Sequence, residues 1–516
     1  MNGAESVLST ASAAGLTICF ANPGTTELPF VSALDQIPEI RPVLCLAEAV
    51  CAGAADGYAR LAGKPALTLL HLGPGLANGL AYFHNARRAG TPIVNIIGDH
   101  ASWHLAADAP LTSDIEALAK SVSTWVRSAT SAQGLGSDIA EAIYHAAGGI
   151  ACLIVPADYQ AATVHVEVTS PPPRVPQAAS DPDIEKVAKA LLMNEPNALF
   201  LGGAALSAAG LTAAGRIRAA TGCTLLHETF AARVERGGNL PNVTRLPYLP
   251  AQARETLSSF AAVVLAGARE PVSFFGYEGQ PSSFIPTTTA VRVLAPAPQD
   301  SFFDVVGALE SLADFLGRED ARVAPTSGNL PKVPTGRLTP QRMAATIAAV
   351  QPANAVIVDE SITSGFDYYS LSLNAPRHTY LAPHVGGAIG HGLPLATGAA
   401  LAAAERPVIV LEGDGSGMYT LQSLWTHARE QLNVTTVICA NRQYRILQLE
   451  LGCEVPADVG SATDTLLNID RPTLDWVSIA RGFGVPARSV QTAQELAAEL
   501  KRAIAEPGPH LIEAVL

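Results

Sequence analysis

Residues 408–441 read VIVLEGDGSGMYTLQSLWTHAREQLNVTTVICAN, and this stretch decides the predicted fold. An apolar run at 408–411 leads into a glycine-rich turn, a helical pattern near 418–430 and a second apolar run at 435–439. Continuous apolar runs of this length are typical of strands that are covered on both faces. Strand, helix and strand in this order predict one unit of a parallel sheet.

The same order recurs near the start of the chain, where residues 68–99 read TLLHLGPGLANGLAYFHNARRAGTPIVNIIGD. Similar apolar runs alternate with helical patterns through most of the chain. This alternation predicts an α/β fold made of doubly wound parallel sheets. The other predicted strands are Ala66–Leu70, Pro92–Ile97, Cys152–Val155, Leu199–Leu201, Ala262–Ala266, Val291–Leu294 and Val356–Val358.

Two proline-rich stretches, Val168–Pro182 and Arg318–Pro340, interrupt the alternation. Such a composition is typical of linkers. The chain has 516 residues, and a domain usually has about 100–200. Length and linkers together predict three α/β domains at residues 1–165, 184–318 and 338–516.

The chain carries 33 Lys and Arg against 46 Asp and Glu, a net charge of −13, and only 15% of its residues are charged. An apolar fraction of 48% excludes a disordered chain, and the acidic balance argues against nucleic-acid binding. The uncharged run His378–Ala404 is long enough to span a bilayer. Its glycines, prolines and histidines are poor for a lipid-facing helix, so we expect no membrane span.

The first residues, MNGAESVLST, contain no basic region followed by an apolar run, so we expect no secretion signal. The seven cysteines are scattered and form no CxxC pair. We therefore expect reduced thiols in a cytoplasmic protein.

The turn after the first run is Gly413-Asp414-Gly415-Ser416, and Asn441 follows the second run. Because the carboxyl ends of parallel strands meet at one edge of a sheet, Asp414 and Asn441 can reach one ion. A carboxylate, an amide oxygen and the backbone carbonyl of Gln443 are ligands that suit Mg²⁺. Free amides at the start of a helix attract phosphate oxygens. The motif therefore predicts a site for a metal ion and a phosphate group.

Other glycine motifs fit this stretch less well. A dinucleotide fingerprint needs GxGxxG, whereas residues 413–418 read GDGSGM and the loop from Gly73 reads GPGLANG. A nucleophile elbow, GxSxG, would need glycine at position 414. A purely structural turn stays the alternative, and it leaves the spacing of Asp414 and Asn441 unexplained.

The motif resembles the GDGS…N signature of thiamine diphosphate (ThDP) enzymes, and the resemblance covers essentially the whole chain, in the branch of acetolactate synthase and benzoylformate decarboxylase. One departure is Ala440, where the family commonly has a first Asn. The resemblance implies ThDP and Mg²⁺ as cofactors. It also implies a pyrimidine-binding domain at 1–165, a central domain at 184–318 and a diphosphate-binding domain at 338–516.

The segment LAEAVCAGAADGYARLAGKPAL resembles the family segment whose glutamate protonates the aminopyrimidine, and Glu48 takes that position. Alternatively, Glu48 is a first-turn residue that the helix dipole stabilises. GGAIGHGLP at 386–394 resembles the strip that holds the cofactor in a bent shape. By that match the Gly387 carbonyl accepts from the 4′-amino group, and Ile389 is the apolar wedge under the bend.

Further positions follow from the resemblance. DESITSG at 359–365 matches a loop near the diphosphate, with Ser361 and Thr363 as possible donors. Tyr444, Arg445 and Ile446 should lie along the phosphates and the thiazolium ring, and ordinary core packing is the alternative for Ile446.

On the substrate side, ANPGTTELPF at 21–30 resembles the substrate loop of benzoylformate decarboxylase. Thr25 could bind a substrate carboxylate or be a simple turn residue. His71 matches a catalytic histidine of that enzyme, and a core histidine is the alternative. Phe275 stands where that enzyme has its second histidine, and Asp99 stands where acetolactate synthases usually have Gln. We also expect two further histidines near the substrate, His100 and His384.

The resemblance implies an enzyme that decarboxylates a 2-oxo acid and ligates the resulting enamine to a second carbonyl, as acetolactate synthase does. The alternatives are a simple 2-oxo acid decarboxylase, a 2-hydroxyacyl lyase and a non-catalytic binding protein of the same fold. A homodimer or homotetramer with active sites at the subunit interface is implied as well. The central domain resembles one that binds FAD in acetolactate synthases, but its sequence contains no decisive FAD contact.

Overall fold

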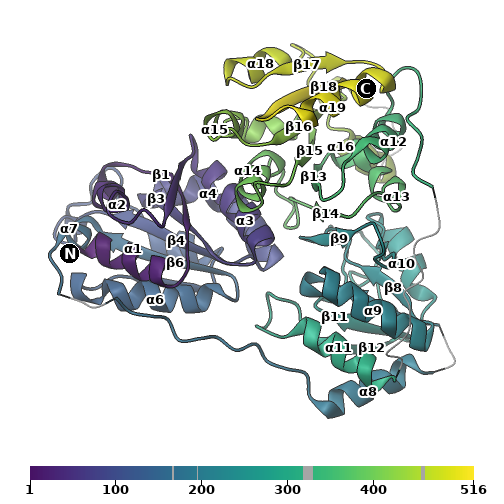
Figure 1. The fold of residues 1–516 in the computed structure, drawn as a ribbon, viewed down its shortest axis with the longest axis horizontal. Helices are drawn as coiled ribbons and strands as arrows, with labels where there is room; N and C mark the ends of the chain where they lie inside the picture. The colour runs from purple at the N-terminus through teal and green to yellow at the C-terminus, as the bar shows by residue number, and fades with distance from the viewer. Residues whose placement is uncertain (166–167, 194–195, 318–328, 455–459) are drawn as a thin grey trace. The chain divides into compact units, whose positions relative to one another are not determined.

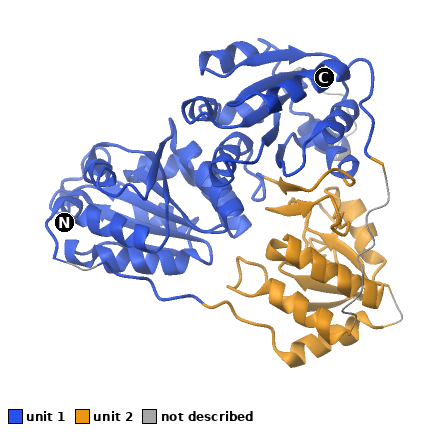
Figure 2. Cartoon of the chain, viewed as in Figure 1, with its two compact units in different colours: residues 1–174, 330–372, 383–516 blue, residues 175–329, 373–382 orange. Residues whose placement is uncertain are grey.

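The computed structural model describes residues 1–165, 168–193, 196–317, 329–454 and 460–516. Figure 2 divides the chain into two compact units. Unit 1 contains residues 1–174, 330–372 and 383–516, and unit 2 contains residues 175–329 and 373–382. The first part of the proposed linker Arg318–Pro340, residues 318–328, lies outside the described residues.

The first sheet of unit 1 has six parallel strands in the order β2-β1-β3-β4-β6-β5 (Figure 1). Helices cover both faces, because one apolar core contains residues of α1, α2 and α6 and the other contains residues of α3, α4 and α5. Burial on both faces explains the continuous apolar strands. The elements are α1 Gly3–Ala13, β1 Ile18–Asn22, α2 Leu28–Leu34, β2 Arg41–Leu44, α3 Glu48–Ala62, β3 Ala66–His71, α4 Leu72–Ala89, β4 Ile93–Asp99, α5 Ile115–Lys120, β5 Trp125–Ser128, α6 Leu135–Ala146 and β6 Ile150–Pro156.

The second sheet of unit 1 contains five parallel strands in the order β17-β18-β16-β15-β13. Its strands are β13 Val356–Glu360, β15 Val408–Gly413, β16 Val434–Ala440, β17 Ala487–Val490 and β18 His510–Val515. Its helices are α12 Pro340–Val350, α13 Tyr368–Leu371, α14 Gly392–Ala402, α15 Ser423–Arg429, α16 Arg445–Glu454, α17 Ser461–Leu467, α18 Trp476–Gly482 and α19 Ala493–Ala505, with 3-10 turns η5 Ile362–Gly365 and η6 Ser416–Tyr419.

The helix expected near 418–430 is interrupted. The turn η6 ends at Tyr419, and α15 begins only at Ser423. Between them Thr420 leaves the helical conformation (φ −139°, ψ 31°), and its hydroxyl donates to the carbonyl of Gly390 at 2.6 Å. A hydrogen bond to a distant segment thus ends the first turn, which the local sequence does not reveal.

Unit 2 has a parallel sheet in the order β10-β8-β7-β11-β12. The uncharged run begins with the strand β14 (His378–Leu381), which pairs antiparallel with β9 (Val234–Arg236). The expectation of parallel sheets is corrected for this pair. The other elements are α8 Asp181–Leu191, β7 Asn197–Leu201, α9 Ala208–Thr221, β8 Thr224–His227, β10 Thr244–Arg245, α10 Pro250–Ser258, β11 Ala262–Ala266, β12 Ala290–Ala295 and α11 Val305–Phe315.

The α/β fold class is confirmed, and every predicted strand is present with small shifts of its ends. Within unit 1, α3 and α14 lie side by side (Figure 1). Glycines allow their backbones to touch, because a Cβ on Gly398 would overlap the carbonyl oxygen of Ala54. Gly57 stands equally close to the carbonyl of Leu395.

The six cysteines with described side chains are buried and unpaired: Cys19, Cys45, Cys51, Cys152, Cys223 and Cys439. Burial raises the pKa of Cys19 to about 12 and that of Cys152 to about 11, so both thiols stay protonated. The side chain of Cys453 lies outside the described part. Among the helices of the described ranges, none combines the length and apolarity needed to cross a bilayer.

Candidate active site

Two neighbouring strands carry the predicted metal ligands past their carboxyl ends. Gly413 of β15 pairs with Cys439 of β16, and Asp414 and Asn441 follow directly. The Asp414 carboxylate is buried and accepts from the backbone amides of Arg442 (2.6 Å) and Gly415 (3.0 Å). Burial raises the pKa of Asp414 to about 6. The structure therefore brings both residues to one sheet edge.

The donor set at this edge fits Mg²⁺ and a diphosphate. The Asp414 carboxylate, the Asn441 amide oxygen and the Gln443 carbonyl are hard oxygen donors, as Mg²⁺ prefers. The amide of Gln443 donates to Asn441 Oδ1 at 3.1 Å, which orients that side chain. A Cβ at Gly415 would lie 2.7 Å from the Tyr444 ring, so glycine keeps the turn close to α16. In the described residues no cluster of three or more His, Cys, Asp or Glu side chains could hold a metal.

Ser361 and Thr363 lie on the segment that follows β13. The buried Ser361 hydroxyl donates to Asp359 Oδ1 at 2.5 Å, and the Ser361 amide donates to the same oxygen at 3.1 Å. Thr363 lies in the turn η5, whose first residue, Ile362, has φ +50°. A β-branched residue in this region indicates a strained backbone, which is typical of functional loops.

Tyr444, Arg445 and Ile446 lie where β16 leads into α16. The Arg445 guanidinium donates to Gln448 Oε1 at 2.8 Å, and Ile446 is half-buried. Burial raises the pKa of Tyr444, so its phenol stays protonated. Gln448 also donates to Gln443 Oε1 at 3.0 Å and thereby connects α16 with the predicted carbonyl ligand.

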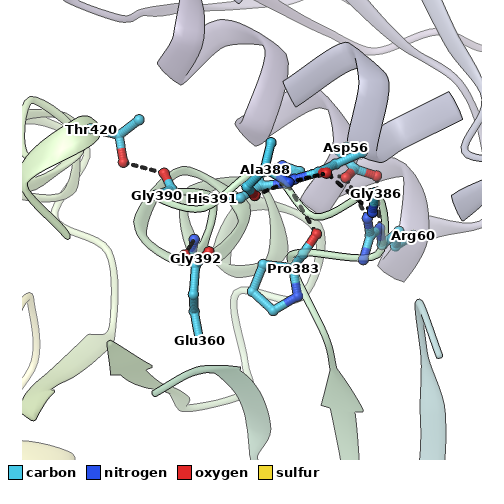
Figure 3. A network of polar contacts seen from close by, with 11 residues as sticks. Asp56, Arg60, Glu360, Pro383, Gly386, Ala388, Gly390, His391, Gly392 and Thr420 are labelled. Carbon is cyan, nitrogen blue, oxygen red and sulfur yellow. Dashed lines mark hydrogen bonds and ion pairs between the residues drawn. The ribbon is translucent and has the colours of Figure 1, made fainter. Parts of the chain in front are cut away.

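The strip that precedes α14 turns at two glycines in the left-handed region, Gly387 (φ +88°) and Gly390 (φ +80°). The amide of Gly387 donates to the carbonyl of His384 at 2.9 Å. Figure 3 shows the bond from Thr420 to Gly390, which ties the strip to the turn after the Gly413–Ser416 motif. The structure thus brings together two segments whose roles were predicted separately.

A buried pair of carboxyl groups, Glu360 and Glu412, was missed in the sequence. The two residues are register partners on β13 and β15 and have no exposed surface. Glu360 accepts from the amide of Gly392 at 2.5 Å, and Glu412 accepts from the Ser416 hydroxyl. Burial raises both pKa values, that of Glu360 to about 8, so the pair holds a proton at neutral pH. The available signal was a glutamate at the end of each strand, in VIVDE at 356–360 and VIVLE at 408–412.

Glu48 is the first residue of α3, and its side chain is buried. The Asn78 amide donates to Glu48 Oε2 at 3.1 Å, and a Cβ on Gly75 would lie 3.3 Å from Oε1. Both neighbours belong to α4, whose first turns contain the glycines that the sequence suggested as a loop. Glu48 is therefore held by its own domain.

His71 ends β3 and faces a carboxylate that sequence reasoning missed. Its Nδ1 lies 2.8 Å from Glu27 Oε2 and 3.2 Å from the Thr26 hydroxyl, and Glu27 is fully buried. Thr25 itself is exposed. Leu72, directly after His71, has φ +51°, another strained position at a strand end. The available signal for Glu27 was that it is the one acidic residue in ANPGTTELPF.

The remaining substrate candidates lie on other segments. The His100 ring lies 5.5 Å from that of His104, and burial raises the pKa of the neighbouring Asp99. His384 lies in the turn before the strip, and Phe275 is exposed on unit 2.

The fold and this sheet edge define a ThDP-dependent enzyme. The N-terminal TPP binding domain of thiamine pyrophosphate enzymes matches residues 1–119, and the C-terminal TPP binding domain matches residues 364–514. The chain belongs to this family, within the group that contains acetolactate synthase and benzoylformate decarboxylase.

Three relatives illustrate the match. A Mycobacterium tuberculosis protein named "Putative acetolactate synthase large subunit IlvX" is 48% identical, over 100% of this chain and 99% of that protein. Benzoylformate decarboxylase of Pseudomonas aeruginosa is 29% identical, over 97% and 96%. The solved structure of ThDP-dependent 4-hydroxybenzoylformate decarboxylase from Rhodococcus jostii RHA1 superposes with a TM-score of 0.86 at 27% identity, covering 99% of this chain and 98% of that one.

Proposed function

We propose that the protein uses ThDP and Mg²⁺ to decarboxylate a 2-oxo acid and to ligate the remaining fragment to a second carbonyl compound. The observation that carries this proposal is the pair Asp414 and Asn441, which follow neighbouring strands at one sheet edge. The name of the 48% identical relative supports ligation as the outcome.

In this proposal, Asp414, Asn441 and the Gln443 carbonyl hold the ion, and the amides of residues 415–419 face the diphosphate. Glu48 would transfer a proton to the pyrimidine ring, and the Gly387 carbonyl and Ile389 would support the bent shape of the cofactor. When bound, ThDP supplies the electron sink that decarboxylation requires. The apolar surroundings of Glu48 exclude water and strengthen its interaction with the ring.

A second candidate is simple decarboxylation with release of an aldehyde. The contact between His71 and Glu27 favours it, because a carboxylate on Nδ1 leaves Nε2 as the nitrogen that can take up a proton and then deliver it. The names of the Pseudomonas and Rhodococcus relatives point the same way.

We also propose that a second copy of the chain completes each site, in a homodimer or a larger assembly. Glu48 and the Asp414 edge belong to the separately matched N- and C-terminal TPP binding domains, which is compatible with two copies each contributing one of them. The buried, unpaired cysteines support a reducing compartment such as the cytoplasm.

A product analysis tests the reaction. Purified protein with ThDP and Mg²⁺ is given pyruvate, benzoylformate and other 2-oxo acids, and carbon dioxide, aldehydes and ketols are measured. Carbon dioxide together with a ketol is the expected result. Aldehyde alone would favour the second candidate, and no turnover of any 2-oxo acid would contradict the proposal.

Two variants test the residue roles. Glu48→Gln should lower kcat by about 100-fold or more, since general acid catalysis contributes this much. Asp414→Ala should weaken Mg²⁺-dependent binding of ThDP. The controls are the exposed Glu39→Gln and Asp35→Ala, which should behave like the unmodified protein. Undiminished turnover in Glu48→Gln would remove that residue from the mechanism.

A further inference from the structure

Three side chains from the second half of helix α4 contact the strip at 386–394 that leads into α14. The Tyr82 hydroxyl donates to the carbonyl of Ile389 at 3.3 Å, and His84 Nε2 lies 3.1 Å from the carbonyl of Gly386. Asn85, which has no exposed surface, lies between these contacts. The strip is therefore held from the α4 side along the length that contains Gly387.

All the polar contacts of the Asn85 side chain go to this strip, at Gly386, Ala388 and His391. Its Oδ1 accepts from the amides of Gly386 (3.1 Å) and Ala388 (3.2 Å). Its Nδ2 donates to the carbonyl of Ala388 (2.7 Å) and faces His391 Nδ1 at 2.9 Å. An amide side chain offers two donors and two acceptor lone pairs, and all four are engaged here. Because these bonds lie on both sides of Gly387, they fix the direction of its peptide groups.

A second chain of contacts orients the histidine that Asn85 meets. His391 Nε2 lies 3.3 Å from Asp56 Oδ2, and Arg60 donates to the same carboxylate through Nε (2.7 Å) and Nη2 (2.6 Å), as Figure 3 shows. Burial lowers the pKa of His391 to about 4, so the ring is neutral. His391 Nδ1 also lies 3.1 Å from the carbonyl of Pro383, so this nitrogen faces one donor and one acceptor. Asp56 and Arg60 thus hold the His391 ring beside Asn85, and the two backbone amides that donate to Oδ1 set the orientation of the Asn85 amide.

We propose that Asn85 is a positioning residue that fixes the strip Gly386–Ile389 in the conformation that bends the cofactor. This inference rests on the proposed role of the strip and assigns Asn85 no contact with the cofactor. Removing its side chain would leave the amides of Gly386 and Ala388 and one carbonyl without their buried partner, and the strip would relax.

The same contact can be disturbed from the strip side. A Cβ on Gly386 would lie 2.7 Å from Asn85 Oδ1 and 2.7 Å from His84 Cδ2. Gly386→Ala therefore pushes the strip away from α4 and leaves Asn85 in place. Asn85→Ala and Gly386→Ala disturb the same contact from opposite sides, so both should weaken ThDP binding.

The experiment compares two ligands in the presence of Mg²⁺. ThDP would contact both the strip and the metal edge, whereas inorganic diphosphate would contact only the metal edge. We expect Asn85→Ala and Gly386→Ala to weaken ThDP binding by about tenfold or more, the effect of losing one or two buried hydrogen bonds, with the affinity for diphosphate unchanged. Asn85→Asp keeps the oxygen that accepts from Gly386 and Ala388 but loses the Nδ2 donor to the Ala388 carbonyl, so it should also weaken ThDP binding.

The matched control is Asn95→Ala. Asn95 is equally buried in the same domain, but it bonds to Thr68 and Cys152 instead of the strip, so both affinities should stay unchanged. Unaltered ThDP affinity in a folded Asn85→Ala protein would overturn the inference, and so would an equal loss for both ligands. Where Asn85→Ala does not fold, Gly386→Ala decides by the same criteria. An unmodified protein that binds no ThDP would instead overturn the proposed function.

Discussion

At the scale of the residue, removing the Glu27 carboxylate tests whether His71 needs a buried carboxylate beside its Nδ1. It has no exposed surface and contacts His71 Nδ1. We predict that Glu27→Gln lowers kcat by about 10- to 100-fold, since proton transfer by a well-oriented group contributes at least this much. Steady-state kinetics with the accepted 2-oxo acid measure the effect. A kcat equal to that of the Glu39→Gln control would show that His71 needs no carboxylate.

His427 gives a prediction for pH. The side chain is buried, its Nε2 lies 2.9 Å from the Thr397 hydroxyl, and burial lowers its pKa from 6.5 to about 4. Between these values the unfolded chain binds a proton that the folded chain does not, so the unfolding free energy falls as the pH is lowered. The contribution is fully present above pH 6.5, and it is lost at about 1.4 kcal/mol per pH unit on the way down to about pH 4.

His427→Gln should therefore make the unfolding free energy depend less steeply on pH in this window. Urea unfolding at a series of pH values measures the slope. The exposed His165→Gln is the control and should keep the original slope. An unchanged slope in His427→Gln would mean that His427 is protonated in the folded protein.

The sequence allowed the sheet-edge residues to be predicted but not their partners. Asp414 and Asn441 follow apolar runs, and strand order alone brings them to one edge. Asn85 could not be predicted in this way, since it meets a strip some three hundred positions later. Glu27 likewise acquires its role only through the fold, because His71 lies 44 residues away in the sequence.

At the scale of the element, the crossing of α3 and α14 depends on glycine. We predict that Gly398→Ala lowers the free energy of unfolding by about 1–3 kcal/mol, because the new methyl group overlaps the carbonyl of Ala54. The melting temperature of the cofactor-free protein measures the change. Gly482→Ala is the control, since a Cβ there meets open space, and it should change the free energy by less than about 0.5 kcal/mol. Equal melting temperatures for the two variants would contradict close packing at the crossing.

The elements also show where a local sequence pattern is sufficient to predict a strand or a helix. The predicted strands, such as β3, β4, β15 and β16, are continuous apolar runs, because burial on both faces largely determines their composition. The break between η6 and α15 was not predictable, because the bond from Thr420 to Gly390 that ends the turn comes from another part of the chain. The strand β14 was missed for a similar reason, since its partner β9 lies far away in the sequence.

At the scale of the whole molecule, shared sites would give inactive variants the ability to complement each other. A mixed dimer of Glu48→Gln and Asp414→Ala chains contains one site in which both residues are intact. Random pairing should then restore about a quarter of the unmodified activity, because half of the dimers are mixed and each has one of two sites working. Co-expression of the two chains with different tags, followed by assay, measures this. Activity no higher than that of either variant alone would mean that each chain builds its own site.

The reactivity of the buried cysteines can be used to measure local opening of the fold. A thiol in a closed core reacts with an alkylating reagent only when the surrounding segment opens, so each labelling rate measures the stability of one neighbourhood. Cys19 and Cys152 report on the first sheet of unit 1, Cys439 on its second sheet and Cys223 on unit 2. Mass spectrometry of the labelled peptides can therefore rank the three sheets by stability without any engineered probe.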